Sequence, residues 1–346
     1  MVAPNEHEHE QHIYMTVKSG RDSSGTVDIV VFRKGTEGLS TEEYADEIRQ
    51  RLPDLNVRRA RTPGEERELI QNARVATGVS IDEDLLSRAE NLEMFVVASS
   101  GCGHLPLEAL HENDVMLVNA AGIHAPGIAE QVIGNFLVFA RRIHEGWERK
   151  RTRQWRHYQA HEFTDSTVTV VGMGEIGKAI VKRLEGFDVS TIGVRYSPEK
   201  GGPTDEIIGF DTEEFHQALA RTDYLAIATP LSDTTRKLMG PEEFHTLPPH
   251  AVVVNASRGG VVDTDALLEN LQKEGIRGAA LDVTDPEPLP NDHPLWEMGN
   301  AFITPHMGGH TPKHWDRLAD IMADNIAKLD KGMTSSLTNR VSTGSD

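Results

Sequence analysis

Apolar residues recur along the first third of the chain in short runs that alternate with amphipathic segments. The candidate strands are 27–32, 57–59, 73–77, 95–98 and 115–118, and the candidate helices between them are 41–51, 65–71 and 82–89. Short β-branched runs bounded by turn residues are typical of buried strands, and apolar positions three and four apart are typical of helices. The pattern therefore predicts a small βα unit with a parallel sheet.

A second and longer set of alternating segments begins after a mostly apolar helix at 128–144 and an arginine-rich stretch at 141–156. Its apolar runs are 167–171, 189–194, 224–228, 252–255, 279–283 and 301–304. Six strands that alternate with helices form the doubly wound dinucleotide-binding pattern. We expect a last helix at 314–329, after which the polar tail from Ser335 to Asp346 is expected to fray.

Length and composition agree with two units. The chain has 346 residues, of which 38% are hydrophobic, and this length corresponds to about two domains. No run of 18 apolar residues is present, so we expect no transmembrane helix and no membrane partner. The acidic, histidine-rich start at residues 1–12 lacks the basic and apolar regions of a signal peptide.

The formal net charge of −19 limits the partners that the chain can bind. Such a surface repels nucleic acid, so we expect no nucleic-acid partner. The basic residues are 11 Lys and 24 Arg, 35 in all. An acidic, lysine-poor chain resembles halophilic proteins from a high-salt cytoplasm, which we favour over an ordinary acidic protein. The single cysteine, Cys102, excludes an internal disulfide and fits a reducing, cytoplasmic location.

The run at 167–171 leads directly into a glycine-rich turn that precedes a helix. The turn has the pattern G-x-G-x-x-G and consists of Gly172, Met173, Gly174, Glu175, Ile176 and Gly177. In this context the first glycine permits a tight turn, the second lets the backbone approach a pyrophosphate, and the third lets helix and strand pack closely. The turn is therefore interpreted as a dinucleotide site, the alternative being a glycine-rich turn that binds nothing.

The residue at the end of the second strand indicates which dinucleotide is preferred. NAD-binding proteins usually carry Asp or Glu there, which binds the ribose 2′-hydroxyl, but this chain has Arg195. Arg pairs with a 2′-phosphate in a fork geometry, and the hydroxyls of Tyr196 and Ser197 can add hydrogen bonds. We expect NADP(H) to be preferred and NAD(H) to be possible, the alternative being a solvated surface Arg195.

Three ionisable side chains follow later strands of the same unit. Arg258 stands beside two glycines just past one strand, where it can clamp a carboxylate. Glu287 and His306 follow the next two strands. A carboxylate beside an imidazole orients the ring and favours its protonated form, which suits a general acid. Each residue alone is more often structural, but their joint position at adjacent strand ends favours a catalytic site.

These motifs together resemble the D-isomer-specific 2-hydroxyacid dehydrogenase family, over about residues 73–320. The matching segments are 172–177, 229–231 with Thr235, 255–263, 281–288 and 304–308. The resemblance implies that Arg258 binds the substrate carboxylate and carbonyl, that His306 is the acid/base, and that Glu287 is its partner. It implies that the backbone N–H groups of Ser100 and Gly101 bind the carboxylate. Further cofactor contacts are implied for Thr229, Pro230, Ala256, Ser257, His306 and Gly308, and for Asp282, which would hold the nicotinamide carboxamide.

The resemblance also implies an architecture of two Rossmann-like or flavodoxin-like, doubly wound parallel α/β domains, with the active site in the cleft between them. Residues 1–123 and 315–346 would form the substrate-binding domain, and residues 124–314 the dinucleotide-binding domain. The arm from Trp147 to Trp155 would pack against a second subunit, which makes a homodimer. The family usually has Asp at the position of Gly103, so this chain departs from the pattern there.

We therefore expect an oxidoreductase that transfers a hydride between NADP(H) and a small 2-oxo acid or D-2-hydroxy acid, as in a glyoxylate or hydroxypyruvate reductase or a broader 2-ketoacid reductase. The alternatives are an NAD-dependent phosphoglycerate or formate dehydrogenase, and a cofactor-sensing corepressor of the same fold. We expect no metal site. The candidate sets His7, His9 and His12, and His306, His310 and His314, are better explained by a charged terminus and an irregular segment.

Overall fold

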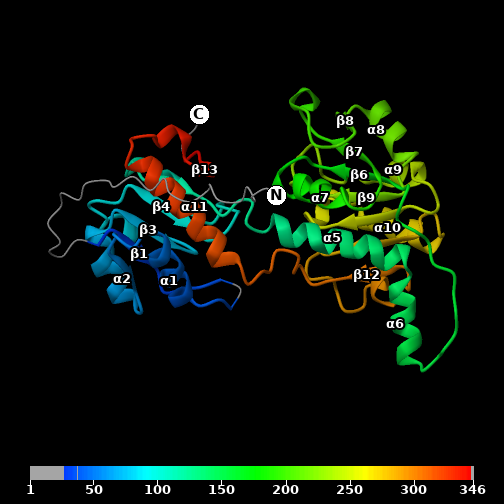
Figure 1. Ribbon diagram of the computed structural model, residues 1–346, viewed down its shortest axis with the longest axis horizontal. Coiled ribbons are helices and arrows are strands. Elements are labelled where there is room, and N and C mark those ends of the chain that lie inside the picture. The colour runs from blue at the N-terminus through cyan, green and yellow to red at the C-terminus, as the bar shows by residue number, and fades with distance from the viewer. Residues whose placement is uncertain (1–26, 37, 344–346) are drawn as a thin grey trace, which may run out of the picture.

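The computed structural model describes residues 27–36 and 38–343, which form two sheets with helices on both faces of each (Figure 1). The first sheet has the strand order β13-β5-β4-β3-β1-β2. Its strands are β1 (Ile29–Val31), β2 (Val57–Arg59), β3 (Val75–Gly78), β4 (Met94–Val97), β5 (Met116–Val118) and β13 (Arg340–Val341). All neighbours pair in parallel except β13, which is antiparallel to β5.

Helices cover both faces of this sheet because its strands are apolar on both sides. One face is covered by α1 (Thr41–Arg51), and the other by α2 (Pro63–Leu69), α3 (Glu83–Leu86) and α4 (Leu107–Glu112). Ser40 caps α1 by accepting a hydrogen bond from the Glu42 N–H at 3.2 Å, which fixes where that helix starts.

The second sheet has the order β12-β11-β10-β9-β6-β7-β8, and all its strands are parallel. They are β6 (Thr167–Val171), β7 (Ser190–Val194), β8 (Glu206–Ile208), β9 (Tyr224–Ile227), β10 (Val252–Asn255), β11 (Gly278–Leu281) and β12 (Ala301–Ile303). Its helices include α7 (Glu175–Leu184), α8 (Thr212–Leu219), α9 (Pro241–Thr246) and α10 (Thr264–Gln272). The expected six strands are present, and β8 is an additional edge strand whose three residues are too few to give a periodic signal.

The crossover from the first sheet to the second differs from the single helix expected at 128–144. It consists of α5 (Ala125–Ala140) and α6 (Ile143–Arg151). Arg142 separates them with a φ of +53°, a left-handed conformation that an α-helix cannot contain. The chain therefore turns, and α6 projects away from the second sheet in Figure 1.

The last helix, α11 (His314–Leu329), packs against α1 on the first sheet, although the second sheet lies between them in the sequence (Figure 1). The rings of Tyr44 and Trp315 stack with centroids 4.4 Å apart. Arg51 donates hydrogen bonds to Asp316 and Asp320, each at 2.6 Å. The first sheet is thus completed by both ends of the described chain, but the exact domain boundaries stay a prediction.

The expectation that the tail from Ser335 frays is wrong for most of its length. Arg340 and Val341 pair with Val118 and Leu117 of β5, and the Asn339 amide donates to the carbonyl of Ala121 at 2.7 Å. The edge of β5 supplies the hydrogen-bonding partners of this segment. The sequence of the polar tail alone therefore does not indicate that it forms a strand.

Two expectations concern membranes and metals. None of the helices formed by the described residues combines the length and apolar character needed to cross a bilayer. Within residues 27–36 and 38–343, no three His, Cys, Asp or Glu side chains converge so that they could hold a metal ion. His7, His9 and His12 lie outside the described residues.

Candidate active site

The glycine-rich turn joins β6 to α7 at the carboxyl edge of the second sheet. Gly172 has a φ of +103°, and a Cβ there would lie 2.6 Å from the Ala228 carbonyl oxygen. A Cβ on Gly177 would overlap the Gly172 carbonyl oxygen, whereas one on Gly174 would meet nothing within 4 Å. Because the first N–H groups of α7 have no intrahelical acceptor, the turn forms an open cradle with free donors. A dinucleotide pyrophosphate fits such a cradle.

The other three residues of the turn differ in exposure. Met173 is buried, Ile176 is half-buried and Glu175 is exposed at the first turn of α7. The hydrogen-bond donors of this turn are therefore its backbone N–H groups. The Met173 side chain anchors the turn in the core that it shares with α5 and α7.

Arg195 follows the last residue of β7 and is held in place by the backbone around it. Its N–H donates to the Ile208 carbonyl at 3.1 Å, and its Nη1 donates to the Gly201 carbonyl at 2.5 Å. No carboxylate of a described residue lies within 4 Å of its guanidinium, so its charge is not compensated by an ion pair. Tyr196 is 80% exposed and Ser197 is half-buried beside it. This site can accept a phosphate next to the end of β7.

Arg258 follows β10 and is exposed, and its loop is fixed by a buried asparagine. Asn255 is 1% exposed; its Nδ2 donates to the Arg258 carbonyl at 3.0 Å and its Oδ1 accepts from the Ser257 N–H at 3.1 Å. The Arg258 Nη1 donates to the Ser257 carbonyl at 2.7 Å, and the described residues provide no carboxylate within 4 Å of it. A Cβ on Gly259 would overlap the Thr284 carbonyl, so this loop lies directly against the segment after β11.

His306 and Glu287 form a direct pair. Glu287 Oε1 accepts a hydrogen bond from His306 Nδ1 at 2.5 Å, and the two side chains are 41% and 46% exposed, respectively. The pair occupies Nδ1, while no described residue bonds Nε2, so that nitrogen can exchange a proton with a bound molecule. The expected joint arrangement of these two residues at adjacent strand ends is present.

The backbone of His306 is strained, and Asp282 holds it. His306 has a φ of +51°, which is unfavourable for a residue with a Cβ, and its N–H donates to the Asp282 carbonyl at 2.8 Å. The Asp282 carboxylate is 5% exposed and accepts from the N–H groups of Met307 at 3.0 Å and Gly308 at 2.9 Å. It also accepts from Thr304 Oγ1 at 2.6 Å. Asp282 therefore fixes the loop that presents His306.

Gln131 on α5 completes this network. Its Nε2 donates to Asp282 Oδ1 and to Thr304 Oγ1, both at 2.8 Å. A Cβ on Gly308 would lie 2.9 Å from Asp282 Oδ2 and from Gln131 Oε1, so only glycine fits there. The sequence analysis missed Gln131 and gave Asn255 no role, because a single polar residue on an apolar helix or at the end of a strand has no local signature.

The loop after β4 in the first sheet contains the expected carboxylate-binding amides. The Ser99 Oγ donates to the Gly101 carbonyl at 2.8 Å, and the Asn119 Nδ2 donates to the Ser100 carbonyl at 2.8 Å. These bonds use carbonyls only, and no acceptor in the described part of the chain is bonded to the N–H of Ser100 or Gly101. Both donors remain open to an anion.

Contacts between the two crossover segments join the loops of the two sheets. His124, just before α5, bonds the Gly309 carbonyl through Nδ1 at 2.7 Å. Arg317 on α11 donates to the Ile123 carbonyl at 2.5 Å. These two hydrogen bonds join the crossover segments to each other, directly after the loop of His306.

The remaining expected cofactor contacts lie along the same edge. Thr229, Ala256 and Ser257 are buried at the ends of β9 and β10, and Pro230 is exposed. The Thr235 Oγ1 donates to the Pro230 carbonyl at 2.6 Å, which shapes the loop after β9. Because β9 and β10 lie between β6 and β12 in the sheet, these positions lie between the glycine-rich turn and the loop of His306.

The family model for the D-isomer specific 2-hydroxyacid dehydrogenase NAD binding domain matches residues 133–308. This match spans half of the chain and includes the turn, Arg195, Arg258, Glu287 and His306. The chain belongs to the D-isomer specific 2-hydroxyacid dehydrogenase family.

Two similar proteins match the chain over most of its length. It is 31% identical to a D-3-phosphoglycerate dehydrogenase of Methanocaldococcus jannaschii over 84% of this chain, but this covers only 56% of that protein. It is 32% identical to a glyoxylate reductase of Thermofilum pendens over 80% of this chain and 86% of that protein.

Solved structures of the same fold extend the likeness to three dimensions. The TT0316 protein from Thermus thermophilus is 28% identical, with a TM-score of 0.67, and the likeness covers 90% of this chain and 99% of that one. The expectation of a two-sheet α/β fold is thus confirmed.

Proposed function

We propose that this family member is an NADP(H)-dependent oxidoreductase that interconverts a small 2-oxo acid and its D-2-hydroxy acid. The observation that carries the proposal is the combination of an unpaired Arg258 with the His306–Glu287 pair, on loops that follow adjacent strands. A 2-oxo acid needs a cation for its carboxylate and an acid for its carbonyl oxygen. The proposed site supplies both.

The substrate would be held from two sides. The Arg258 guanidinium has a free edge that can form paired hydrogen bonds with a carboxylate, and it would also polarise the adjacent carbonyl. The open N–H groups of Ser100 and Gly101 would bind the same carboxylate from the first sheet. Closure of the two domains about the crossover segments would bring the two sets together and exclude water.

His306 would move the proton. In reduction, its Nε2 would donate a proton to the oxygen that develops negative charge, while Glu287 holds Nδ1 and stabilises the protonated ring. In oxidation, the neutral ring would accept the proton from the hydroxyl. A bound nicotinamide supplies or accepts the hydride at the same carbon. Asp282 keeps the loop of His306 in place, and this role is proposed in addition to its expected contact with the nicotinamide carboxamide.

The preference for NADP(H) rests on Arg195. Its guanidinium lies at the end of β7 without a carboxylate partner among the described residues, beside the hydroxyls of Tyr196 and Ser197. This charge suits a 2′-phosphate, whereas a carboxylate at the same place would suit a 2′-hydroxyl.

Similar proteins support a substrate class. Glyoxylate reductases and a glyoxylate/hydroxypyruvate reductase of Pectobacterium carotovorum, 31% identical, favour a small 2-oxo acid. Phosphoglycerate dehydrogenase is the second candidate, because the Methanocaldococcus relative carries that name. Glu287 opposes a formate dehydrogenase, since formate has no carbonyl that needs protonation.

A panel of turnover measurements separates these functions. The purified chain is assayed with NADPH and with NADH against glyoxylate, hydroxypyruvate and longer 2-oxo acids, and with the oxidised cofactors against 3-phosphoglycerate and formate. We expect the highest kcat/KM with NADPH and a small 2-oxo acid. Turnover confined to NAD with 3-phosphoglycerate would support the second candidate. Cofactor binding without turnover of any of these substrates would favour a corepressor.

We also propose that the enzyme is a homodimer. Trp147 on α6 and Trp155 just after it are 62% and 93% exposed, which is unusual for aromatic side chains of this size. A second subunit would cover them. Light scattering should give twice the mass of 38.2 kDa, and replacing both tryptophans with Ser should shift the protein towards the monomer.

The acidic surface supports a halophilic, cytoplasmic enzyme. A net charge of −19 destabilises a folded chain by self-repulsion, which about 1 M salt screens within a few ångströms. The midpoint of thermal unfolding should therefore rise as KCl is increased from low to molar concentration.

A further inference from the structure

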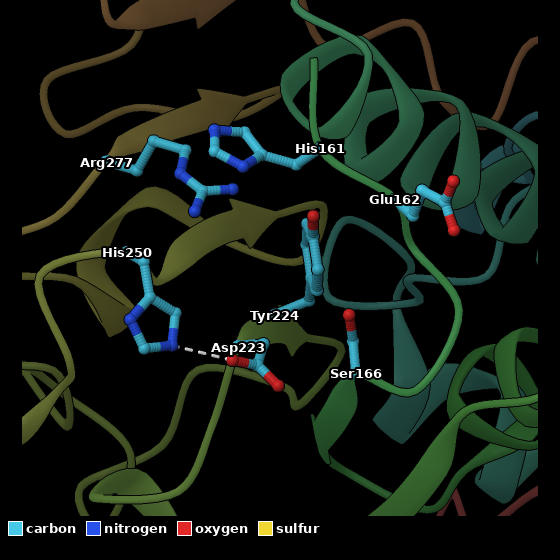
Figure 2. Close-up of a pocket in the computed structure, with 7 residues that line it drawn as sticks. All are labelled: His161, Glu162, Ser166, Asp223, Tyr224, His250 and Arg277. Atoms are coloured by element: carbon cyan, nitrogen blue, oxygen red, sulfur yellow. Dashed lines mark hydrogen bonds and ion pairs between the residues drawn. The ribbon is translucent and has the colours of Figure 1, made fainter. Parts of the chain in front are cut away.

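A cavity lies at the amino-terminal edge of the second sheet, the edge opposite to the proposed active site, and Figure 2 shows its lining side chains. Ser166, Asp223 and Arg277 each stand immediately before β6, β9 and β11, and His250 lies just before β10. His161 closes the cavity from the segment that leads into β6. The volume of about 230 Å³ is below the roughly 300 Å³ at which pockets for larger organic ligands begin, so it suits a small ligand.

Four hydrogen-bond donors of this cavity have no carbonyl or carboxylate acceptor among residues 27–36 and 38–343. They are the Arg277 guanidinium, the His161 ring and the hydroxyls of Ser166 and Tyr224. Tyr224 is only 2% exposed, and burial raises the pKa of its hydroxyl, which the neighbouring Arg277 opposes. Ser166 and Tyr224 are buried, Arg277 is half-buried and donates to the Tyr224 hydroxyl, and His161 is exposed. The remaining donors of these side chains can therefore bond a ligand in the cavity.

Arg277 is the permanently charged cation that lines the cavity, and no carboxylate of the described residues lies within 4 Å of it. Both carboxylate oxygens of Asp223 are already hydrogen-bonded. Its Oδ1 bonds His250 Nε2 at 2.7 Å, and its Oδ2 accepts from the Thr167 N–H at 2.7 Å. The Glu162 carboxylate points away from the other labelled side chains in Figure 2. Burial lowers the pKa of His161, and the charges of Arg277, Arg142 and His250 lower it further. An anion in the cavity could pair with Arg277, which forms no ion pair with a described residue.

Among the described residues, the backbone N–H groups at the starts of β9, β10 and β11 are already bonded. The N–H groups of Asp223, Val252 and Arg277 bond the carbonyls of Thr167, Asp223 and Ala251 at 2.9 Å each. Recognition must therefore come from side chains, and single substitutions can test it.

We propose that this cavity, the edge cavity, binds a small oxyanion such as inorganic phosphate or a small dicarboxylate, at a site separate from the active site. Arg277 supplies the charge, and the hydroxyls of Ser166 and Tyr224 donate to the anion's oxygens. The sheet separates this anion from the substrate and cofactor groups, which follow the carboxyl ends of the same strands. The proposal therefore does not depend on the reaction that the enzyme catalyses.

Calorimetric titration of the purified full chain with inorganic phosphate, at fixed ionic strength, tests the proposal. Arg277→Gln should weaken phosphate binding at least about tenfold, and Tyr224→Phe should weaken it by a smaller factor. A parallel titration with malonate distinguishes the two sources of the oxyanion, because the tighter ligand identifies whether the cavity prefers tetrahedral or planar groups.

Arg221→Gln is the matched control. Arg221 lies two residues before Asp223 at the same edge but is paired with Glu206 at 2.6 Å, outside the cavity. Its loss changes the net charge equally and should leave binding within about twofold. The proposal is overturned if neither anion binds, if Arg277→Gln binds like wild type, or if Arg221→Gln weakens binding as much. Should Arg277→Gln fail to fold, Tyr224→Phe and His161→Asn decide by the same criterion.

Discussion

His306 and Glu287 are separated by 19 residues in sequence, yet their side chains meet because β11 and β12 are neighbours and both loops leave the same edge. We predict that His306→Ala retains cofactor affinity but loses about 10² to 10⁴-fold in kcat, since a positioned general acid contributes about that factor. Steady-state kinetics with NADPH and the best 2-oxo acid measure it. A variant that keeps more than half of the wild-type kcat would exclude His306 as the acid.

Arg258 provides a second test of the site, because we propose that its planar guanidinium binds the substrate carboxylate. We predict that Arg258→Lys raises KM for the oxo acid and lowers kcat/KM by roughly 10 to 150-fold, since Lys cannot form the paired hydrogen bonds of a guanidinium. Arg236→Lys, on an exposed loop residue, is the control and should leave the kinetics unchanged. Near-wild-type kinetics for Arg258→Lys would mean that the side chain is only solvated.

The third prediction concerns Arg195 and the preference for NADPH over NADH. Arg195→Asp removes a favourable charge, adds a repulsive one against a 2′-phosphate, and supplies an acceptor for the 2′-hydroxyl of NADH. Each effect should contribute on the order of 1–3 kcal/mol, so the NADPH preference should be reversed or strongly reduced, mainly through the cofactor KM. The measurement is kcat/KM for both cofactors at one salt concentration. A wild-type preference for NADH, or an unchanged preference in the variant, would refute this role.

At the scale of elements, sequence periodicity predicted those segments whose structure is decided locally. The strands at Thr167–Val171 and Val252–Asn255 and the helices at Thr41–Arg51 and His314–Leu329 lie where the pattern places them. Periodicity did not predict β13, because its hydrogen-bonding partners lie on β5. It also did not predict the helix break at Arg142, because Arg is a good helix former and gives no sign of a break.

Some residues of the candidate site could be predicted from the sequence, and others could not. Gly172, Arg258, Glu287 and His306 carry recognisable chemistry after recognisable strands, so the sequence could name them. Gln131 could not be named, because only the three-dimensional structure brings α5 to Asp282. Supporting residues of this kind follow from packing, which local sequence patterns do not contain.

At the scale of the whole molecule, the two sheets are joined where α11 begins, and a buried histidine lies at that junction. His314 is 1% exposed, and neither ring nitrogen has a well-formed hydrogen bond among the described residues. Its ring lies 5.3 Å from that of His124, centroid to centroid. Burial is the main cause that lowers the pKa of His314 from 6.5 to about 4; the His124 charge also lowers it, and the nearby Ala98 backbone opposes both.

This shift makes the stability of the molecule depend on pH. The unfolded chain binds the proton with the ordinary pKa of 6.5, and the folded chain only near 4, so protonation favours unfolding. The contribution is therefore fully present above pH 6.5 and is lost as the pH falls towards 4. Between about pH 8 and pH 5, this group alone should remove about 2 kcal/mol from the free energy of unfolding.

We predict that His314→Phe, which cannot be protonated, lacks this component and loses less stability on acidification than wild type. Urea unfolding at about pH 8, 6.5 and 5, at fixed salt, measures the free energy of unfolding of both proteins. His111→Phe, at an exposed position on α4, is the control and should follow the wild-type pH dependence. The comparison depends on how stability changes with pH and not on its absolute value, so a general packing defect in His314→Phe does not imitate the effect. Parallel curves for wild type and His314→Phe would show that the buried ring does not titrate on unfolding.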